Sequence, residues 1–326
     1  MNSPDSPFPI PRSPFPIPHS PFPIPHSPDL SANWVSTLAD LVRRASTRLP
    51  DDVLAALQKG AKTAEMPRAA TILSTICQNA DLAARNATPM CQDTGTLTFW
   101  VEHPAGVSQR RISAAIREAV SVATARGFLR QNTILPVDGK SVADNVADGA
   151  PSIHFEEVEG GPVRVSLLLK GGGCENMSCQ YSLPDASLSA GRDLTGVRAC
   201  VLHAVWRAQG MGCAPGILGV CIGGDRAEGY LRAKRQLLRP LDDESPDPLL
   251  AGLERTVLKE ANTLGIGPMG LGGNTTLLGV KIAGASRLPA SFFVTVAYSC
   301  WACRRQTVEI DPATGLPITE SEVRHD

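Results

Sequence analysis

The chain has 326 residues, 43% of them hydrophobic, and its 31 basic and 32 acidic residues leave a formal net charge of -1. Such a chain can bury one large core or two medium ones, so it is typical of a globular protein. The charge balance gives no long-range field that would attract nucleic acid or anionic lipid. No apolar run approaches a membrane span, and the N-terminus does not resemble a signal peptide, so we expect a soluble, cytoplasmic chain with no nucleic acid or membrane partner.

Residues 1–29 contain a tandem repeat that reads SPFPIPR, SPFPIPH and SPFPIPH between Ser6 and His26. This density of proline is incompatible with helices and with the hydrogen bonds between β-strands. The segment is therefore predicted to be polyproline II or disordered. It could bind an aromatic-lined groove, but we favour a duplicated tail with no binding role. His19 and His26 belong to this tail and are not candidate metal ligands.

From Leu30 onward, the spacing of apolar residues is typical of a folded domain. Helices are predicted over residues 34–49, 51–62, 68–86, 112–125, 194–208, 227–238 and 248–264, and strands over 97–101, 163–169, 217–222, 277–282 and 292–298. The order lacks the regular alternation of a parallel doubly wound sheet. We therefore expect an α+β (irregular α/β) fold, with a single globular domain over residues 30–310 and a polar C-terminal tail over 311–326.

Nine cysteines are scattered along the chain, at positions 77, 91, 174, 179, 200, 213, 221, 300 and 303. A secreted disulfide scaffold would be short and dense in cysteine, so a reducing compartment fits better. Free thiolates are then available to bind a metal or a cluster.

The segment CQDTGT at 91–96 places a thiol two residues before a carboxylate. The Cys91 thiolate is a soft metal ligand, and the Asp93 carboxylate could move protons beside whatever the sulfur binds. On these residues alone, a buried cysteine followed by an Asp-stabilised turn is an equally good interpretation.

Three glycine-rich loops have the sequences KGGG at 170–173, IGG at 222–224 and GPMGLGG at 267–273. Exposed backbone N–H groups in such loops can bind anions. None matches a nucleotide-binding motif, so carboxylate binding stays open beside a simple turn. The CWAC segment at 300–303 follows a strand and has no second pair at short spacing, which disfavours both a thioredoxin motif and a zinc site. One of its thiols is expected to be a cluster ligand and the other a bystander.

Taken in order, these motifs resemble the class I, iron-sulfur-dependent fumarate hydratases. The resemblance is to their N-terminal domain, which in two-subunit members and in the related L-tartrate dehydratases is a separate alpha subunit. It spans Leu30 to Arg305 and rests on CQDTGT at 91–96, FLR at 128–130, DN at 144–145, HFE at 154–156, KGGGCENMS at 170–178, GCAPGILGVCIGG at 212–224, GPMGLGG at 267–273 and CWACRR at 300–305.

The resemblance implies a 4Fe-4S cluster bound by only three thiolates, those of Cys91, Cys213 and Cys300. The fourth, open iron would act as a Lewis acid on a small dicarboxylate substrate. Asp93 would be the acid that protonates the departing hydroxide. The substrate-binding residues implied in the same way are Gln92, Arg130 and Gly173.

The chain departs from the family pattern at several positions. Leu288 stands where some relatives have histidine, which leaves the substrate open. Cys174, Cys221 and Cys303 stand where other residues are common, and we interpret them as spare thiols that pack. Single-chain members carry a C-terminal domain that supplies the catalytic base. Here we expect a separate beta subunit and thus a hetero-oligomer.

The leading hypothesis is the alpha subunit of a hydro-lyase that interconverts fumarate and (S)-malate, a reaction of the tricarboxylic acid cycle. The main alternative is the alpha subunit of an L(+)-tartrate dehydratase, which would form oxaloacetate. A non-catalytic cluster-binding sensor is a third hypothesis, disfavoured by the presence of Asp93 and Arg130. A zinc or thioredoxin-like module would rest on CWAC alone.

Overall fold

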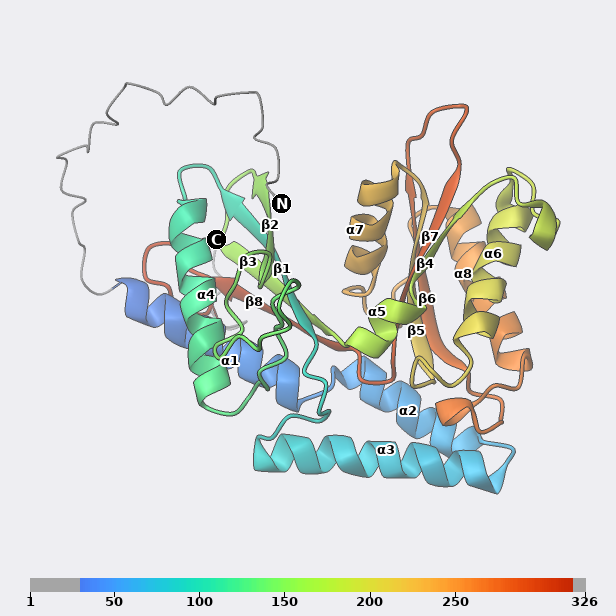
Figure 1. Ribbon diagram of the computed structural model, residues 1–326, viewed down its shortest axis with the longest axis horizontal. Helices are drawn as coiled ribbons and strands as arrows, with labels where there is room; N and C mark the ends of the chain where they lie inside the picture. The colour runs from blue at the N-terminus through green and yellow to red at the C-terminus, as the bar shows by residue number, and fades with distance from the viewer. Residues whose placement is uncertain (1–29, 319–326) are drawn as a thin grey trace, which may run out of the picture.

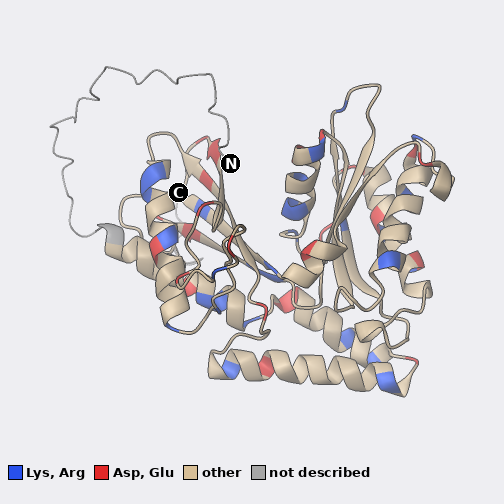
Figure 2. Ribbon diagram, viewed as in Figure 1, with Lys and Arg blue, Asp and Glu red and all other residues tan. Residues whose placement is uncertain are grey.

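The computed structural model describes residues 30–318 and confirms the expected α+β fold, with helices packed on two mixed four-stranded sheets (Figure 1). The prediction for the proline-rich segment 1–29 lies outside the described residues. In this view basic and acidic residues are interspersed over both halves of the molecule (Figure 2). No helix within residues 30–318 has the length and apolar character needed to cross a membrane.

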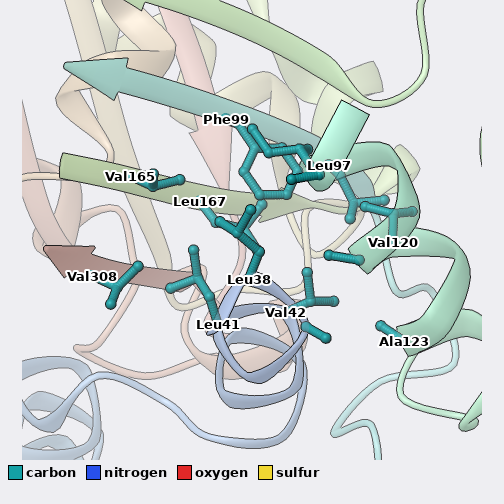
Figure 3. Close-up of a cluster of buried hydrophobic side chains, with 14 of the residues drawn as sticks. Leu38, Leu41, Val42, Leu97, Phe99, Val120, Ala123, Val165, Leu167 and Val308 are labelled. Carbon is teal, nitrogen blue, oxygen red and sulfur yellow. The ribbon is translucent and has the colours of Figure 1, made fainter. Parts of the chain in front are cut away.

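The first sheet packs against two helices, α1 (Leu30–Thr47) and α4 (Gln109–Ala125). Its strand order is β2 (Ser152–Val158), β1 (Thr96–Pro104), β3 (Val163–Lys170) and β8 (Arg304–Ile310). Only the β1 and β2 pair is parallel. The core between sheet and helices contains Leu38, Leu41, Phe99, Leu167 and Val308 (Figure 3). Because these side chains recur at helical spacing on α1 and at alternate positions on the strands, they reach the same layer.

The second sheet lies between helices. Its strand order is β4 (Cys179–Ser182), β7 (Phe293–Ser299), β5 (Gly216–Gly223) and β6 (Leu277–Ala285), with β5 and β6 parallel. In Figure 1, α7 (Arg226–Gln236) lies on one side of this sheet, whereas α6 (Leu194–Ala208) and α8 (Pro248–Thr263) lie on the other. Aspartates accept N–H bonds at the starts of these three helices, as expected for N-caps.

Two chain segments run from one sheet to the other. The first leaves β3 and enters β4 through the short helix α5 (Gly172–Met177), and the second leaves β7 and enters β8. Strand β3 pairs with β8 in the first sheet, and β4 pairs with β7 in the second. The two crossing segments therefore connect strands that are neighbours in each sheet. Helices α2 (Asp51–Thr63) and α3 (Pro67–Asn86) pack beneath this junction, where a third buried cluster of side chains lies.

The C-terminal residues that the structure describes fold back on α1. The side chain of Thr37 donates a hydrogen bond of 3.0 Å to the carbonyl of Gly315, and Ile310 bridges to Pro317. The short 3-10 turns are Ala186–Leu188 and Pro268–Gly270. The division into residues 1–29, 30–310 and 311–326 stays a prediction.

Candidate active site

The three cysteines proposed as ligands come from three separate loops at the junction of the two sheets. Cys91 precedes β1, Cys213 precedes β5, and Cys300 directly follows β7. Burial raises the pKa of Cys213, and the nearby groups of Cys300, Cys91 and Asp93 raise it further. The three thiols and the carboxylate are therefore close enough to interact electrostatically.

The loop that carries Cys213 has a constrained backbone. Cys213 has φ of +52°, which is uncommon for a residue other than glycine. Its N–H donates to Gly210 and its carbonyl accepts from Trp301, at 3.0 and 3.3 Å. A side chain at Gly212 would approach the ring of buried Tyr298 to 2.4 Å. Strained conformations that the surroundings hold in place are typical of functional sites.

Sequence reasoning missed the fourth thiol of this site, that of Cys174. Its Sγ lies 4.0 Å from the carbonyl oxygen of Gly212, next to Cys213. Interaction with the Cys300 thiol lowers the pKa of Cys174 and, together with burial, raises the pKa of Cys300 well above its ordinary value. Cys303 instead lies against the carbonyl of Leu237, with Sγ 3.8 Å away, and is fully buried. The position of Cys174 directly after GGG was the only sequence signal for its place in the site.

Asp93 is held by three N–H donors. Its Oδ2 accepts from Gly172 N at 2.7 Å, and its Oδ1 accepts from Gly95 N at 3.0 Å and from the Asn132 side chain at 3.4 Å. Gly95 has φ of +83°, and a Cβ there would lie 2.8 Å from the backbone of Lys170. Glycine is therefore required where the Asp93 loop passes β3.

A pocket of about 600 Å³ opens beside Asp93. The Gln92, Arg130 and Asn132 side chains line it, and Gln92 and Arg130 are exposed. Gly172 lines the pocket, whereas Gly173 is exposed one residue further along α5. The pocket thus combines an amide, a guanidinium and a carboxylate, which are groups that can bind a polar, acidic small molecule.

The segment that carries Arg130 is fixed by the buried side chain of Asn145. Its Oδ1 accepts from the N–H groups of Asn132 and Thr133, at 2.9 and 3.0 Å, and its Nδ2 donates to the carbonyl of Arg130 at 2.7 Å. Arg130 N also donates to the Thr94 hydroxyl at 3.2 Å. The Thr94 bond links the Arg130 segment to the Asp93 loop, and the Asn145 bonds assign that residue of the DN pair at 144–145 a positioning role.

Helix α5 is tied down by an ion-pair network. Buried Lys170 contacts Glu175 at 2.8 Å and the Ser178 hydroxyl at 3.0 Å, and Glu175 also pairs with Lys234. Burial lowers the pKa of Lys170, and Glu175 opposes that shift. Because Gly172 N comes from α5, this network also positions the donor that binds Asp93.

The donor set fits an iron-sulfur cluster better than a single ion. Within residues 30–318 no three Cys, His, Asp or Glu side chains are placed to bind one metal ion. In a cubane each thiolate binds a different iron, so the ligands must surround a larger object. Cys91, Cys213 and Cys300 on three converging loops, with a buried cation in Arg304, meet that chemical requirement.

Leu288 lies away from these residues. It is 73% exposed on the connection between β6 and β7, at the opposite end of β7 from Cys300. The pocket beside Asp93 does not include it.

A sequence model of the fumarate hydratase (Fumerase) family matches residues 35–309. A Geobacillus stearothermophilus protein that carries the name of a class I fumarate hydratase is 49% identical over 284 residues, which cover 86% of this chain and 55% of that protein. The chain thus spans about half the length of this relative.

Other relatives match over nearly their whole length. A Methanocaldococcus jannaschii protein named as an L(+)-tartrate dehydratase alpha subunit is 32% identical, over 82% of this chain and 94% of its own. The L(+)-tartrate dehydratase alpha subunit of Escherichia coli K12 is 31% identical, over 83% of this chain and 88% of its own. By the extent of these matches, the chain belongs to the fumarate hydratase family, as a domain of the class I, alpha-subunit type.

Proposed function

We propose that this chain is the cluster-binding alpha subunit of an iron-sulfur hydro-lyase that interconverts fumarate and (S)-malate. The observation that carries the proposal is the proximity of Cys91, Cys300 and Asp93 to Cys213, together with the pocket that Asp93 lines. The 49% identity to a protein named for fumarate hydration favours the fumarate and (S)-malate pair over other dicarboxylate substrates.

In this proposal the three thiolates hold a 4Fe-4S cluster, which supplies a Lewis acid for the substrate hydroxyl and carboxylate. Asp93 protonates the departing hydroxide in dehydration and takes the proton back in hydration. Its three N–H donors keep the carboxylate aimed at the pocket. Fixing the acid in advance in this way removes a reorganisation cost from the reaction.

The remaining residues bind and orient the substrate. Arg130 offers a planar fork of N–H donors that matches a carboxylate. The Gln92 amide and the Gly173 N–H add neutral donors near the same pocket. Two carboxylates held at fixed positions would place the hydroxyl-bearing carbon beside Asp93.

A separate beta subunit completes the site in this proposal and supplies the base that removes the carbon-bound proton. The support is that the 31–32% identical relatives are themselves named as alpha subunits. The partner would also cover the pocket and exclude water from the reaction.

L(+)-tartrate dehydration is the alternative, because the relatives that this chain matches over nearly their whole length carry that name. (S)-Malate and L(+)-tartrate, the two molecules to be dehydrated, differ by one hydroxyl, and a site built to bind that hydroxyl discriminates strongly against the analogue that lacks it. The beta subunit would contribute to this choice.

The test is anaerobic purification of the chain alone and together with a beta-type partner, followed by iron and sulfide analysis and assays with fumarate and L-tartrate. We expect a cluster in both preparations and fumarate hydration only by the pair. Tartrate turnover without fumarate hydration would establish the alternative. Full activity of the chain alone would contradict the need for a partner, and a cluster without turnover of either substrate by the pair would favour the sensor hypothesis.

A further inference from the structure

Arg304 is a buried cation with no carboxylate partner. Its side chain is 1% exposed and is the largest of the fully buried side chains. No ion pair joins it to a carboxylate within residues 30–318, whereas buried Lys170 and Arg305 each have one, with Glu175 and Asp52 respectively. An isolated buried charge is strongly unfavourable, so such a group is expected to have a counter-charge.

The hydrogen bonds of Arg304 do not supply that counter-charge. Nη1 donates to the backbone carbonyl of Asp93 at 2.8 Å, and Nε is buried with no acceptor in the described part of the chain. The Asp93 carboxylate is instead bound by Gly172, Gly95 and Asn132. Both the positive charge and one N–H of Arg304 therefore lack a partner.

The position of Arg304 indicates which group could balance its charge. It is the first residue of β8, four residues after Cys300, and it contacts the loop of Asp93, two residues after Cys91. Contact with Cys174 and burial raise the pKa of Cys300, and the positive charge of Arg304 opposes that rise. The guanidinium donates to the Asp93 carbonyl, and its Nη2 lies 3.8 Å from the position that a Cβ at Gly171 would occupy. It therefore lies at the junction to which the segments of Cys91 and Cys300 lead.

We propose that Arg304 is the counter-cation of the bound cluster, offsetting the negative charge that three thiolates bring to the Cys300 side of the site. This inference rests on the proposed function, because it requires the cluster. Three thiolates carry more negative charge than a resting cubane core carries positive charge, so the bound unit is an anion. Net charge and hydrogen bonds around a cluster set its reduction potential and its retention.

The next residue along the same strand offers a matched control. Arg305 is also buried, but its Nε donates to the carbonyl of Leu238 at 3.1 Å and its Nη2 pairs with Asp52. Successive side chains of a strand point to opposite faces, so Arg305 points away from the face that Arg304 occupies. The two arginines thus share burial and position in the chain but differ in their surroundings.

The experiment compares Arg304→Gln, Arg304→Lys and Arg305→Gln with the wild-type chain after anaerobic reconstitution. It measures iron and sulfide content, the rate of iron loss to a chelator, the reduction potential by spectroscopic titration, and thermal unfolding of the cluster-free chain. We expect Arg304→Gln to weaken cluster retention by about 10- to 100-fold, the usual effect of losing a group that supports a metal site. Its potential should fall, because removing a positive charge disfavours the more negative reduced state.

Arg304→Lys should restore much of the retention, since it keeps the charge. Cluster-free Arg304→Gln should unfold at or above the wild-type temperature, because an uncompensated buried charge is removed. Arg305→Gln should unfold at a lower temperature yet release iron at the wild-type rate.

Wild-type retention and potential in Arg304→Gln would overturn the inference. A loss of cluster-free stability as large as that of Arg305→Gln would also overturn it, because the role would then be structural. If the wild-type chain itself bound no iron and sulfide, the proposed function would fail, and the inference with it.

Discussion

The side chain of Asp93 is fixed by hydrogen bonds at the edge of the pocket. Its two oxygens are bound by N–H donors from Gly95 in its own loop, from α5 and from the segment after Arg130, so three parts of the chain fix one carboxylate. Substitution by asparagine keeps the size of the side chain but removes its ability to transfer a proton.

Asp93→Asn should therefore keep the cluster content of the wild type while lowering turnover by about 10²-fold or more, the usual contribution of general acid-base catalysis. Anaerobic steady-state assays with the partner subunit, together with iron analysis, measure both quantities. Asp138→Asn, on an exposed loop outside the pocket, is the control. Near-normal turnover of Asp93→Asn would remove this residue from the proposed chemistry.

The cysteines give a second prediction for single residues. Cys91→Ser, Cys213→Ser and Cys300→Ser should each lose the visible absorbance of the cluster, because no ligand of a three-thiolate site can be spared. Cys303→Ser and Cys174→Ser should keep it. A serine at position 174 can still hydrogen-bond to Cys300, and Cys303 faces Leu237 instead. A full cluster in Cys213→Ser would contradict the ligand assignment.

At the scale of elements, the longer helices were predictable because their apolar residues follow a 3.6-residue period and bury one face. The short helix α5, which begins within the KGGG segment, was not predicted. The strands that the sequence did not reveal are β2, β4 and β8, and all three are edge strands. Edge strands are covered less and need less apolar sequence. Strand β8 even begins with two arginines, which are buried only because the Asp93 loop and Asp52 lie beside them.

For the candidate site, too, only part of the arrangement could be predicted from the sequence. The motif series identified Cys91, Asp93, Arg130, Cys213 and Cys300 through resemblance, and the structure brings their loops to one junction. The positions of Cys174 and Arg304 could not be predicted, because they depend on contacts between segments more than 30 residues apart. Such contacts leave no local periodicity in the sequence.

Asn145 organises a whole loop, so its loss should affect more than one bond. Asn145→Ala would leave the N–H groups of Asn132 and Thr133 and the carbonyl of Arg130 without their partners. A buried group that loses its partner costs about 1–3 kcal/mol, and these three bonds are partly buried, so the free energy of unfolding should fall by about that amount in total. The KM for the dicarboxylate should rise, because Arg130 is no longer fixed.

Urea unfolding and steady-state kinetics test this prediction. Asn86→Ala, an exposed asparagine at the end of α3, is the control and should change neither quantity. Unchanged unfolding in Asn145→Ala would show that these hydrogen bonds do not hold the loop.

At the scale of the whole molecule, the candidate site lies within residues 91–304, and each contact described for it joins residues of the part that the structure describes, 30–318. A segment as rich in proline as the N-terminal repeat is not expected to join a packed core. Removal of residues 1–28 should therefore leave cluster content, unfolding temperature and turnover with the partner unchanged. Iron analysis, thermal unfolding and the fumarate assay on the truncated chain measure these three quantities. A changed turnover with normal cluster content would instead assign the repeat a role in assembly with the partner.

The two crossings between the sheets have a mechanical consequence. Cys91 leads into β1 of the first sheet, Cys213 leads into β5 of the second sheet, and Cys300 lies on one of the crossings between them. A group bound to thiols at this junction would restrict motion of one half of the molecule against the other. Cluster loss should then speed amide hydrogen exchange at residues 170–178 and 300–304 while leaving the Phe99 core protected. Oxidative loss of the cluster would first increase the motion of one half against the other. Proteases would then cleave the junction before either sheet unfolds.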